Sequence, residues 1–167
     1  DDPWWTPIPF SFPMPEKKVA LLTKIEGLNI DPIIINELKI VARKLEESGW
    51  IVEEPKAPNF QEAANYQATL WLGEFRRTGG EAIRRENDPD ANFIYSQMSK
   101  RCPDTSIEKF MDSLQQRARI SREWNKFFDQ YPIMLCPITG DIPFPDLKDL
   151  ESEESFDLVF DSMLPLI

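Results

Sequence analysis

The sequence predicts an α/β fold with a small sheet of at least three strands and three main helices. Two observations carry this prediction. Short apolar runs bounded by glycine or proline alternate with longer amphipathic stretches, and the first three such segments follow in the order strand, helix, strand. Tight links within that unit predict two parallel strands joined by a right-handed crossover. A length of 167 residues suits one domain of ordinary size.

The first third of the chain contains this strand–helix–strand unit. Residues 1–15 hold five prolines among aromatic side chains, which favours an extended leader lying on a surface. Residues 17–22 are a predicted strand, apolar on both faces and therefore expected inside a sheet. Asp31 and Pro32 are suited to begin a helix. The elements expected next are an apolar helical face at Ile34, Leu38, Val41 and Leu45, a stop at Gly49 and a second strand over 50–53.

The rest of the chain predicts further helices and one more strand. A helix begins after Asn59 and is broken at Gly79-Gly80, and a capping box over 105–108 opens a long helix that ends near Tyr131. A buried strand over 133–136 follows this helix. The remaining expectations are a loop over 84–90, a short helix over 93–98, an acidic loop over 140–155 and a last helix over 156–163. The expected core stripe of the long helix is Ile107, Phe110, Met111, Leu114, Ala118, Trp124, Phe127 and Phe128.

Composition excludes several classes of function. The net charge of −10 argues against nucleic acid and against an anionic membrane as partner, because both require a basic surface. No apolar run approaches the roughly 18 residues of a membrane span. The absence of histidine excludes Ser-His-Asp and Cys-His catalysis and every metal site that uses imidazole. Cys102 and Cys136 lie far apart without a CxxC pattern, which favours free thiols and a cytoplasmic location.

No motif in the chain supplies an active site. The acidic run after Asp146 lacks the glycine and terminal glutamate of a calcium loop, so we expect a solvated loop and no metal. Ser96 and Lys100 share one helical face without a glycine-rich oxyanion loop, and chance explains the pair better than catalysis. Six dispersed glycines form no phosphate cradle, and no cofactor is expected. The pairs Arg76-Arg77 and Arg84-Arg85 suit a carboxylate or phosphate, although surface ion pairs are the simpler expectation.

Four sequence motifs nevertheless follow a recognisable order. Asp2-Pro3-Trp4-Trp5 precedes the first strand, Asp31-Pro32 opens the first helix, and Leu45-Glu46-Glu47-Ser48-Gly49-Trp50-Ile51-Val52-Glu53-Glu54 joins it to the second strand. The most distinctive motif is Phe128-Asp129-Gln130-Tyr131-Pro132-Ile133-Met134-Leu135-Cys136-Pro137. Together they resemble the latter half of the amidase signature family, amidohydrolases related to the glutamine amidotransferase A subunit and to fatty acid amide hydrolases.

The resemblance implies a part of a large α/β/α sandwich around a mixed sheet. It implies hydrolysis of carboxamide C–N bonds by a nucleophilic serine, a bridging serine and a lysine, without a metal. The glycine- and serine-rich stretch that carries the two serines, and the lysine before it, are absent from this chain, so no catalytic residue can be transferred to it. The chain is then expected to be either one domain by itself or an excised segment following the signature core, inert alone, with the rest of its own fold as partner.

The same resemblance implies that this segment contributes part of the pocket for a small-molecule amide. The candidate substrate-binding residues are Trp71, Phe75, Ile138 and Thr139. Core packing for the two aromatics, and a plain strand exit for Thr139, are the alternative interpretations. The alternative function is a non-catalytic protein-interaction domain of α/β architecture, because a shared architecture does not fix function.

Overall fold

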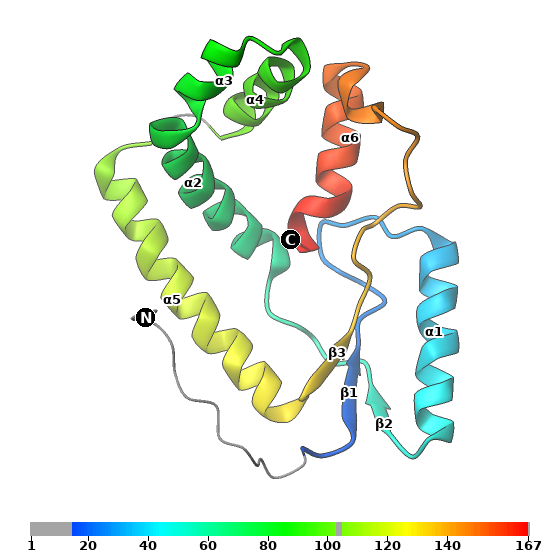
Figure 1. Cartoon of the computed structure of the whole chain (residues 1–167). Helices are drawn as coiled ribbons and strands as arrows, with labels where there is room; N and C mark the ends of the chain where they lie inside the picture. Colours follow the sequence, from blue (N-terminus) through cyan, green and yellow to red (C-terminus); the bar gives the residue numbers. More distant parts are fainter. Residues whose placement is uncertain (1–14, 103–104, 167) are drawn as a thin grey trace, which may run out of the picture.

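The structure is a computed structural model that describes residues 15–102 and 105–166. Apart from its last residue, the predicted leader over 1–15 lies outside the described residues. The described chain has two parts (Figure 1): a three-stranded sheet with one helix packed beside it, and a group of helices above the sheet. We call these parts the sheet region and the helical region.

All strands of the sheet region are parallel, and the predicted α/β fold is confirmed. β1 (Lys18–Leu21) lies in the middle of the sheet, between β2 (Ile51–Glu53) and β3 (Ile133–Leu135). In the register of the sheet, Val19 lies opposite Val52 on one side and Ile133 on the other. The expected strand–helix–strand unit is therefore present, and the third strand joins the free edge of its first strand.

Burial differs between the central strand and the two edge strands. Val19 and Ala20 of β1 are completely buried, as a strand apolar on both faces predicts. Ile51 of β2 is 58% exposed and Ile133 of β3 is 42% exposed. The prediction of a buried third strand over 133–136 is therefore wrong, because β3 has a neighbouring strand on one side only.

The helix of the sheet region is α1 (Pro32–Glu47), which begins and ends close to its predicted limits. The Asp31 side chain accepts a hydrogen bond from the Ile33 amide at 2.7 Å and caps the helix. Its buried face contains Leu38 and Ala42, which pack with Leu21 of β1 into the core of this region. Val41, predicted on this face, is 41% exposed, because the buried stripe is centred on Leu38 and Ala42.

The helical region contains five α-helices. Their bounds are α2 (Phe60–Thr78), α3 (Gly80–Glu86), α4 (Pro89–Arg101), α5 (Ile107–Gln130) and α6 (Glu153–Met163), with 3-10 turns at Lys148–Leu150 (η1) and Leu164–Leu166 (η2). Its core is formed by Leu72, Met98 and Phe156, one residue from each of α2, α4 and α6. The core therefore joins helices that are distant in the sequence.

Helix ends in this region agree with the sequence at some places and differ at others. Asn59 caps α2 by accepting from the Glu62 amide at 2.9 Å, and the helix ends at Gly79. The predicted loop over 84–90 is wrong over most of its length, because α3 continues to Glu86 and α4 already begins at Pro89. Polar residues extend both helices here, because the last turn of α3 and the first two residues of α4 are exposed.

The long helix α5 differs from its prediction in its N-cap residue and in the face that is buried. Ser106, one residue after the predicted start of the capping box, accepts from the Lys109 amide at 3.3 Å. The buried residues of α5 are Ser113, Ile120 and Phe127, whereas Ile107 is 68% exposed and Met111 is 52% exposed. The first turns of the predicted core stripe therefore face outward.

The acidic segment is partly helical. Its last part begins α6, and three carboxylates of this helix form ion pairs with α4: Lys100 with Glu153, and Arg101 with both Asp157 and Asp161. The predicted loop over 140–155 therefore ends at Ser152, the N-cap of α6. The expected last helix over 156–163 is present and starts three residues earlier.

One glycine connects the two regions. The Gly140 carbonyl accepts from the Asp31 amide at 2.8 Å, and the Gly140 amide donates to the Ser162 carbonyl at 2.7 Å. A Cβ atom at this position would lie 2.4 Å from the Asn29 carbonyl oxygen. Only glycine allows this approach without a shift of the backbone.

Among the helices of the described residues, none combines the length and the apolar character that a membrane span requires.

Candidate functional site

A hollowed surface follows the line between α2 and α5. These helices lie side by side (Figure 1) and approach closely where Gly73 faces Phe110, since a Cβ on Gly73 would be 3.0 Å from the Phe110 ring. Two hollows of about 340 and 520 Å³ lie along this line. Both hollows are lined by Gln67, Leu70 and Arg117, so we treat them as one feature, the α2–α5 groove.

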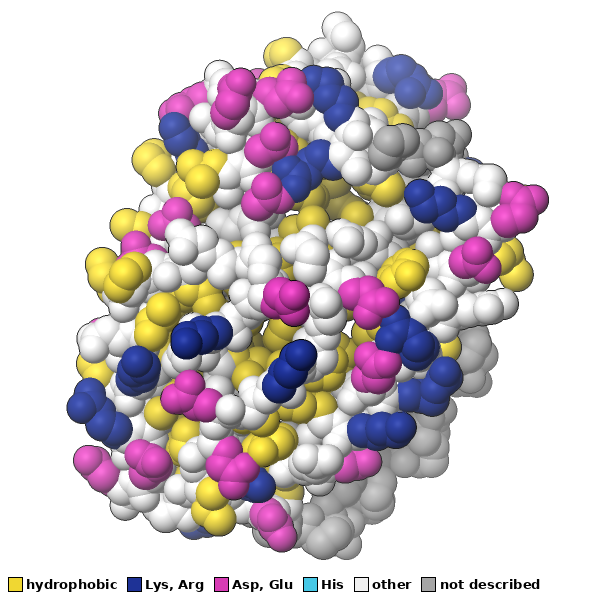
Figure 2. Space-filling model, turned by 180° about the vertical axis from the view of Figure 1, so that it is seen from behind, with side chains coloured by type: hydrophobic (Ala, Val, Ile, Leu, Met, Phe, Trp, Pro, Cys, Tyr) yellow, Lys and Arg dark blue, Asp and Glu magenta, His cyan; other side chains and the backbone are white. Residues whose placement is uncertain are grey.

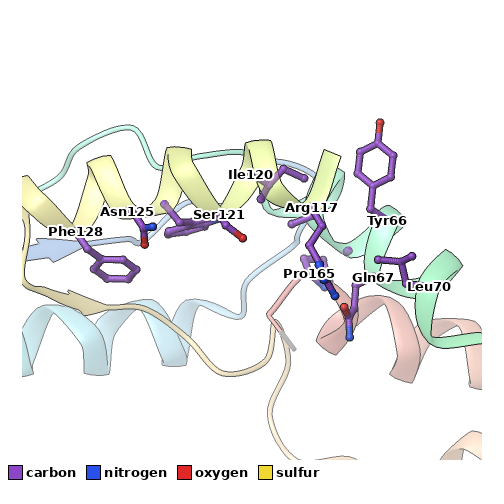
Figure 3. Close-up of a pocket in the computed structure, with 12 residues that line it drawn as sticks. Tyr66, Gln67, Leu70, Arg117, Ile120, Ser121, Asn125, Phe128 and Pro165 are labelled. Atoms are coloured by element: carbon purple, nitrogen blue, oxygen red, sulfur yellow. The ribbon is translucent and has the colours of Figure 1, made fainter. Parts of the chain in front are cut away.

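The smaller hollow combines an apolar wall with polar side chains. Figure 3 shows Arg117 of α5 and Gln67 of α2 extending toward each other beside Pro165, whereas Tyr66 points away. Trp124 is held in place by edge contact with Phe60, at 4.9 Å between ring centroids, and by stacking on Phe128 at 5.8 Å. The remaining lining residues are Ala63, Ala64, Leu70, Ile120, Ser121 and Asn125.

The larger hollow contains one of the predicted pocket residues. Trp71 lines it together with Phe110, Leu114 and Arg77. Trp71 is 48% exposed and stacks on Phe75 at 6.1 Å, and Phe75 makes an edge contact with Tyr95. Phe75 therefore packs between Trp71 and Tyr95 and does not itself line the larger hollow.

The other two predicted pocket residues lie elsewhere. Ile138, three residues after the end of β3, is 88% exposed. The Thr139 hydroxyl lies 3.3 Å from the Ser162 carbonyl, to which it donates, and so belongs to the junction around Gly140. Neither residue lines the α2–α5 groove. The structure thus places Trp71 and Phe75 together and Ile138 and Thr139 together, and their role in substrate binding stays a prediction.

Arginines near the groove differ in their partners. Arg119 of α5 forms ion pairs with Glu123 and Glu62. The hydrogen bond to Glu123 is the main cause that raises the pKa of Arg119 above its usual value. Arg76 donates to the carbonyls of Ser99 and Cys102 and so links α2 to the end of α4. Arg117 takes part in none of the ion pairs found among the described residues.

Sequence reasoning did not find Arg117. The sequence predicted that Trp124 and Phe128 belong to the core stripe of the long helix. In the structure both residues line the smaller hollow, and Phe128 is 40% exposed. The signal that could have found the site is the spacing of Arg117, Ser121, Trp124 and Phe128, which lie three and four residues apart and so share one face of a helix. Polar and aromatic residues alternating on one face are typical of a partly open surface.

The remaining reactive side chains have ordinary surroundings. Ser96 is exposed, and the Lys100 ammonium lies 2.7 Å from a Glu153 carboxylate oxygen. Cys102 and Cys136 are free thiols, and burial raises the pKa of Cys136. No group of three or more potential metal ligands lies together within residues 15–102 and 105–166.

Comparison with known proteins finds relatives in sequence and in fold for most of the chain. No protein family profile matches the chain. A protein named indoleacetamide hydrolase from Bradyrhizobium diazoefficiens is 27% identical over 150 residues, which cover 89% of this chain and 28% of that protein. Another protein of this name, from Bradyrhizobium japonicum, is also 27% identical over 150 residues, or 89% of this chain and 32% of that protein.

A solved structure shares the fold. The chain superposes on a structure named fatty acid amide hydrolase with a TM-score of 0.70 and 17% identity, over 96% of this chain and 29% of that one. The chain therefore spans about three tenths of the length of the relatives it matches. These findings confirm the resemblance that its own motifs predict: in sequence and in fold, this chain is similar to a segment of the amidase-signature hydrolases.

Proposed function

We propose that this chain is a segment of an amidase-signature hydrolase that cleaves carboxamide C–N bonds in the intact protein. The observation that carries the proposal is the match over 150 residues to two proteins named indoleacetamide hydrolase. The chain alone is inert in this proposal, because it lacks the two serines and the lysine that the family uses. Its substrate is a small-molecule amide, and its location is the cytoplasm.

The partner of this segment is the rest of its own fold. Apolar side chains at both sheet edges support this proposal, with Ile51 58% exposed and Ile133 42% exposed. Ile107, Met111 and Trp71 add open apolar surface on the helical region, and Figure 2 shows hydrophobic side chains in open patches between charged groups. Exposed apolar surface and unpaired strand edges are typical of surfaces that another part of a protein covers.

The turn η2 does not add to this open surface. Pro165 is buried, and Leu164 and Leu166 are half-buried, because η2 packs on α2. The open apolar surface named above therefore lies on the sheet edges, on α5 and at Trp71 of α2.

An activity measurement tests the enzyme proposal. Ammonia release from indole-3-acetamide is measured with the purified chain and with the intact protein encoded by the surrounding gene. We expect hydrolysis by the intact protein only. A glycine- and serine-rich stretch with a preceding lysine is expected in the coding sequence before Asp1. Hydrolysis by the chain alone that is lost in Ser96→Ala or Lys100→Met would contradict its inertness.

The alternative function is a non-catalytic protein-interaction domain, which the same open apolar surfaces favour. Sedimentation of the purified chain separates the two proposals. A segment missing its partner surfaces is expected to self-associate as concentration rises. A natural domain is expected to remain monodisperse and to unfold in one cooperative step.

A further inference from the structure

We propose that the smaller hollow of the α2–α5 groove binds an aromatic carboxylate, with Arg117 holding the carboxylate group. This inference does not rest on the proposed hydrolase function, because it concerns binding to the chain as described. Its basis is the combination of shape, charge and aromatic surface in one hollow.

The charge of the hollow is the first step of the argument. The chain carries a net charge of −10, yet Arg117 is the only charged residue among the described residues that line the smaller hollow. The larger hollow of the groove, which Arg117 also lines, adds one acidic and one basic residue, Glu74 and Arg77. Arg119, two residues further on, has its guanidinium occupied by Glu62 and Glu123, whereas Arg117 has no such partner among the described residues. A guanidinium in this setting favours an anion with planar geometry, and a carboxylate fits its fork of donors.

The second step is the apolar wall. Leu70 and Ile120 are buried and form the inner surface of the hollow, and Trp124 and Phe128 stand beside them. Trp124 is fixed by contacts with Phe60, Phe127 and Phe128, so its ring offers a rigid surface at little entropic cost. An aromatic ring against this wall loses apolar surface to water, which favours binding.

The third step concerns orientation. Gln67, Ser121 and Asn125 line the same hollow and supply amide and hydroxyl donors near Arg117. A volume of about 340 Å³ lies within the usual range of ligand pockets, which are mostly apolar with a few convergent polar groups. A ligand with one aromatic ring and one carboxylate on a short linker satisfies both ends of the hollow.

Calorimetric titration with phenylacetate and with its neutral amide, phenylacetamide, tests the proposal. We expect phenylacetate to bind and phenylacetamide to bind at least about tenfold more weakly, since a hydrogen bond to a charged group is stronger than a neutral one. Arg117→Gln is expected to weaken phenylacetate binding by about tenfold. The matched control is Arg122→Gln, which makes the same charge change on α5 but lines neither hollow.

Nuclear magnetic resonance locates the bound ligand. The indole N–H signal of Trp124, assigned by its loss in Trp124→Phe, is expected to shift with phenylacetate in the parent chain and in Arg122→Gln. The proposal is overturned if phenylacetate and phenylacetamide bind equally, or if Arg122→Gln weakens binding as much as Arg117→Gln. It is also overturned if no binding occurs up to about 10 mM phenylacetate. Because Arg117 is exposed, we expect its variant to fold, and its unfolding temperature checks this.

Discussion

The buried core residues of the sheet region lie close together in the sequence, whereas those of the helical region come from three helices that are distant in the sequence. Leu21, Leu38 and Ala42 lie within one strand–helix–strand unit. Leu72, Met98 and Phe156 come from three helices with other elements between them. Local patterns of apolar residues can therefore specify the first core, while the second exists only after distant helices have met.

The two regions also differ in how they use charge. Ion pairs between α4 and α6 join Lys100 and Arg101 to carboxylates of Glu153, Asp157 and Asp161. In the sheet region, Lys18, Glu53 and Tyr131 form a polar cluster at the sheet surface. Exposed ion pairs of this kind contribute little to the free energy of unfolding, so the stability of each region depends mainly on the packing of its core.

The largest effect is expected where the regions join. Gly140→Ala places a Cβ 2.4 Å from the Asn29 carbonyl oxygen and 2.8 Å from Leu28. We expect the free energy of unfolding to fall by about 4 kcal/mol, because overpacking adds to the loss of two hydrogen bonds. Urea unfolding measures this loss. The control is Gly73→Ala, whose new Cβ meets only a movable Phe110 ring, with an expected change within about 1 kcal/mol.

Equal losses in the two glycine variants would show that the close approach at Gly140 does not join the regions as described. A loss in Gly140→Ala with a changed dependence on urea would point instead to a partly unfolded native state.

The next effect compares the two cores directly. Leu72 is 2% exposed and Leu38 is 8% exposed. We expect Leu72→Ala to lower the free energy of unfolding by about 3 kcal/mol and Leu38→Ala by about 2 kcal/mol, since a more enclosed site leaves a larger cavity. Urea unfolding followed by circular dichroism measures both. The reverse order would mean that the sheet region is the more tightly packed of the two.

The smallest effect concerns the polar cluster on the sheet. The hydrogen bond from Tyr131, at 2.7 Å, and then that from Lys18, lower the pKa of Glu53. A lowered folded pKa stabilises the fold above the unfolded value of about 4.3, and this contribution is lost as pH falls through the folded pKa. Glu53→Gln is therefore expected to lower the urea midpoint slightly at pH 7 and not at pH 3.

The same cluster raises the pKa of Lys18 and of Tyr131, chiefly through hydrogen bonds to Glu53. Their contribution is present below about pH 10 and is lost as pH rises through the folded values. Glu37→Gln, an exposed change in the middle of α1, is the control. If the urea midpoints of Glu53→Gln and Glu37→Gln change equally with pH, the cluster of Lys18, Glu53 and Tyr131 is not the cause of the pH dependence.

The sequence was most informative where a signal was local. Asp31-Pro32 and Asn59 predict helix starts because a cap involves only the first turn. Burial on α5 could not be predicted in this way, because helices elsewhere in the chain determine which face is covered. Ile107 and Met111 have the right spacing for a core stripe but remain open, while Ser113 is buried.

The candidate site shows the same division. The family resemblance singled out Trp71, which lines the α2–α5 groove, while its role in substrate binding stays a prediction. Arg117 could not be singled out, because its lack of an acidic partner depends on where Glu62 and Glu123 lie in space, next to Arg119 instead. A residue's charge is visible in the sequence, but its partner is not.

The position of β1 in the middle of the sheet has a consequence for synthesis on the ribosome. Val19 pairs with Val52 soon after both are made, but its other neighbour, Ile133, emerges only after all of α2 to α5. Until then one edge of β1 has no strand beside it. Contacts between residues that are far apart in the sequence, such as those of β1 with β3, form late. Chaperones that shield strand edges are therefore expected to bind the nascent chain during this interval and to leave once β3 has joined.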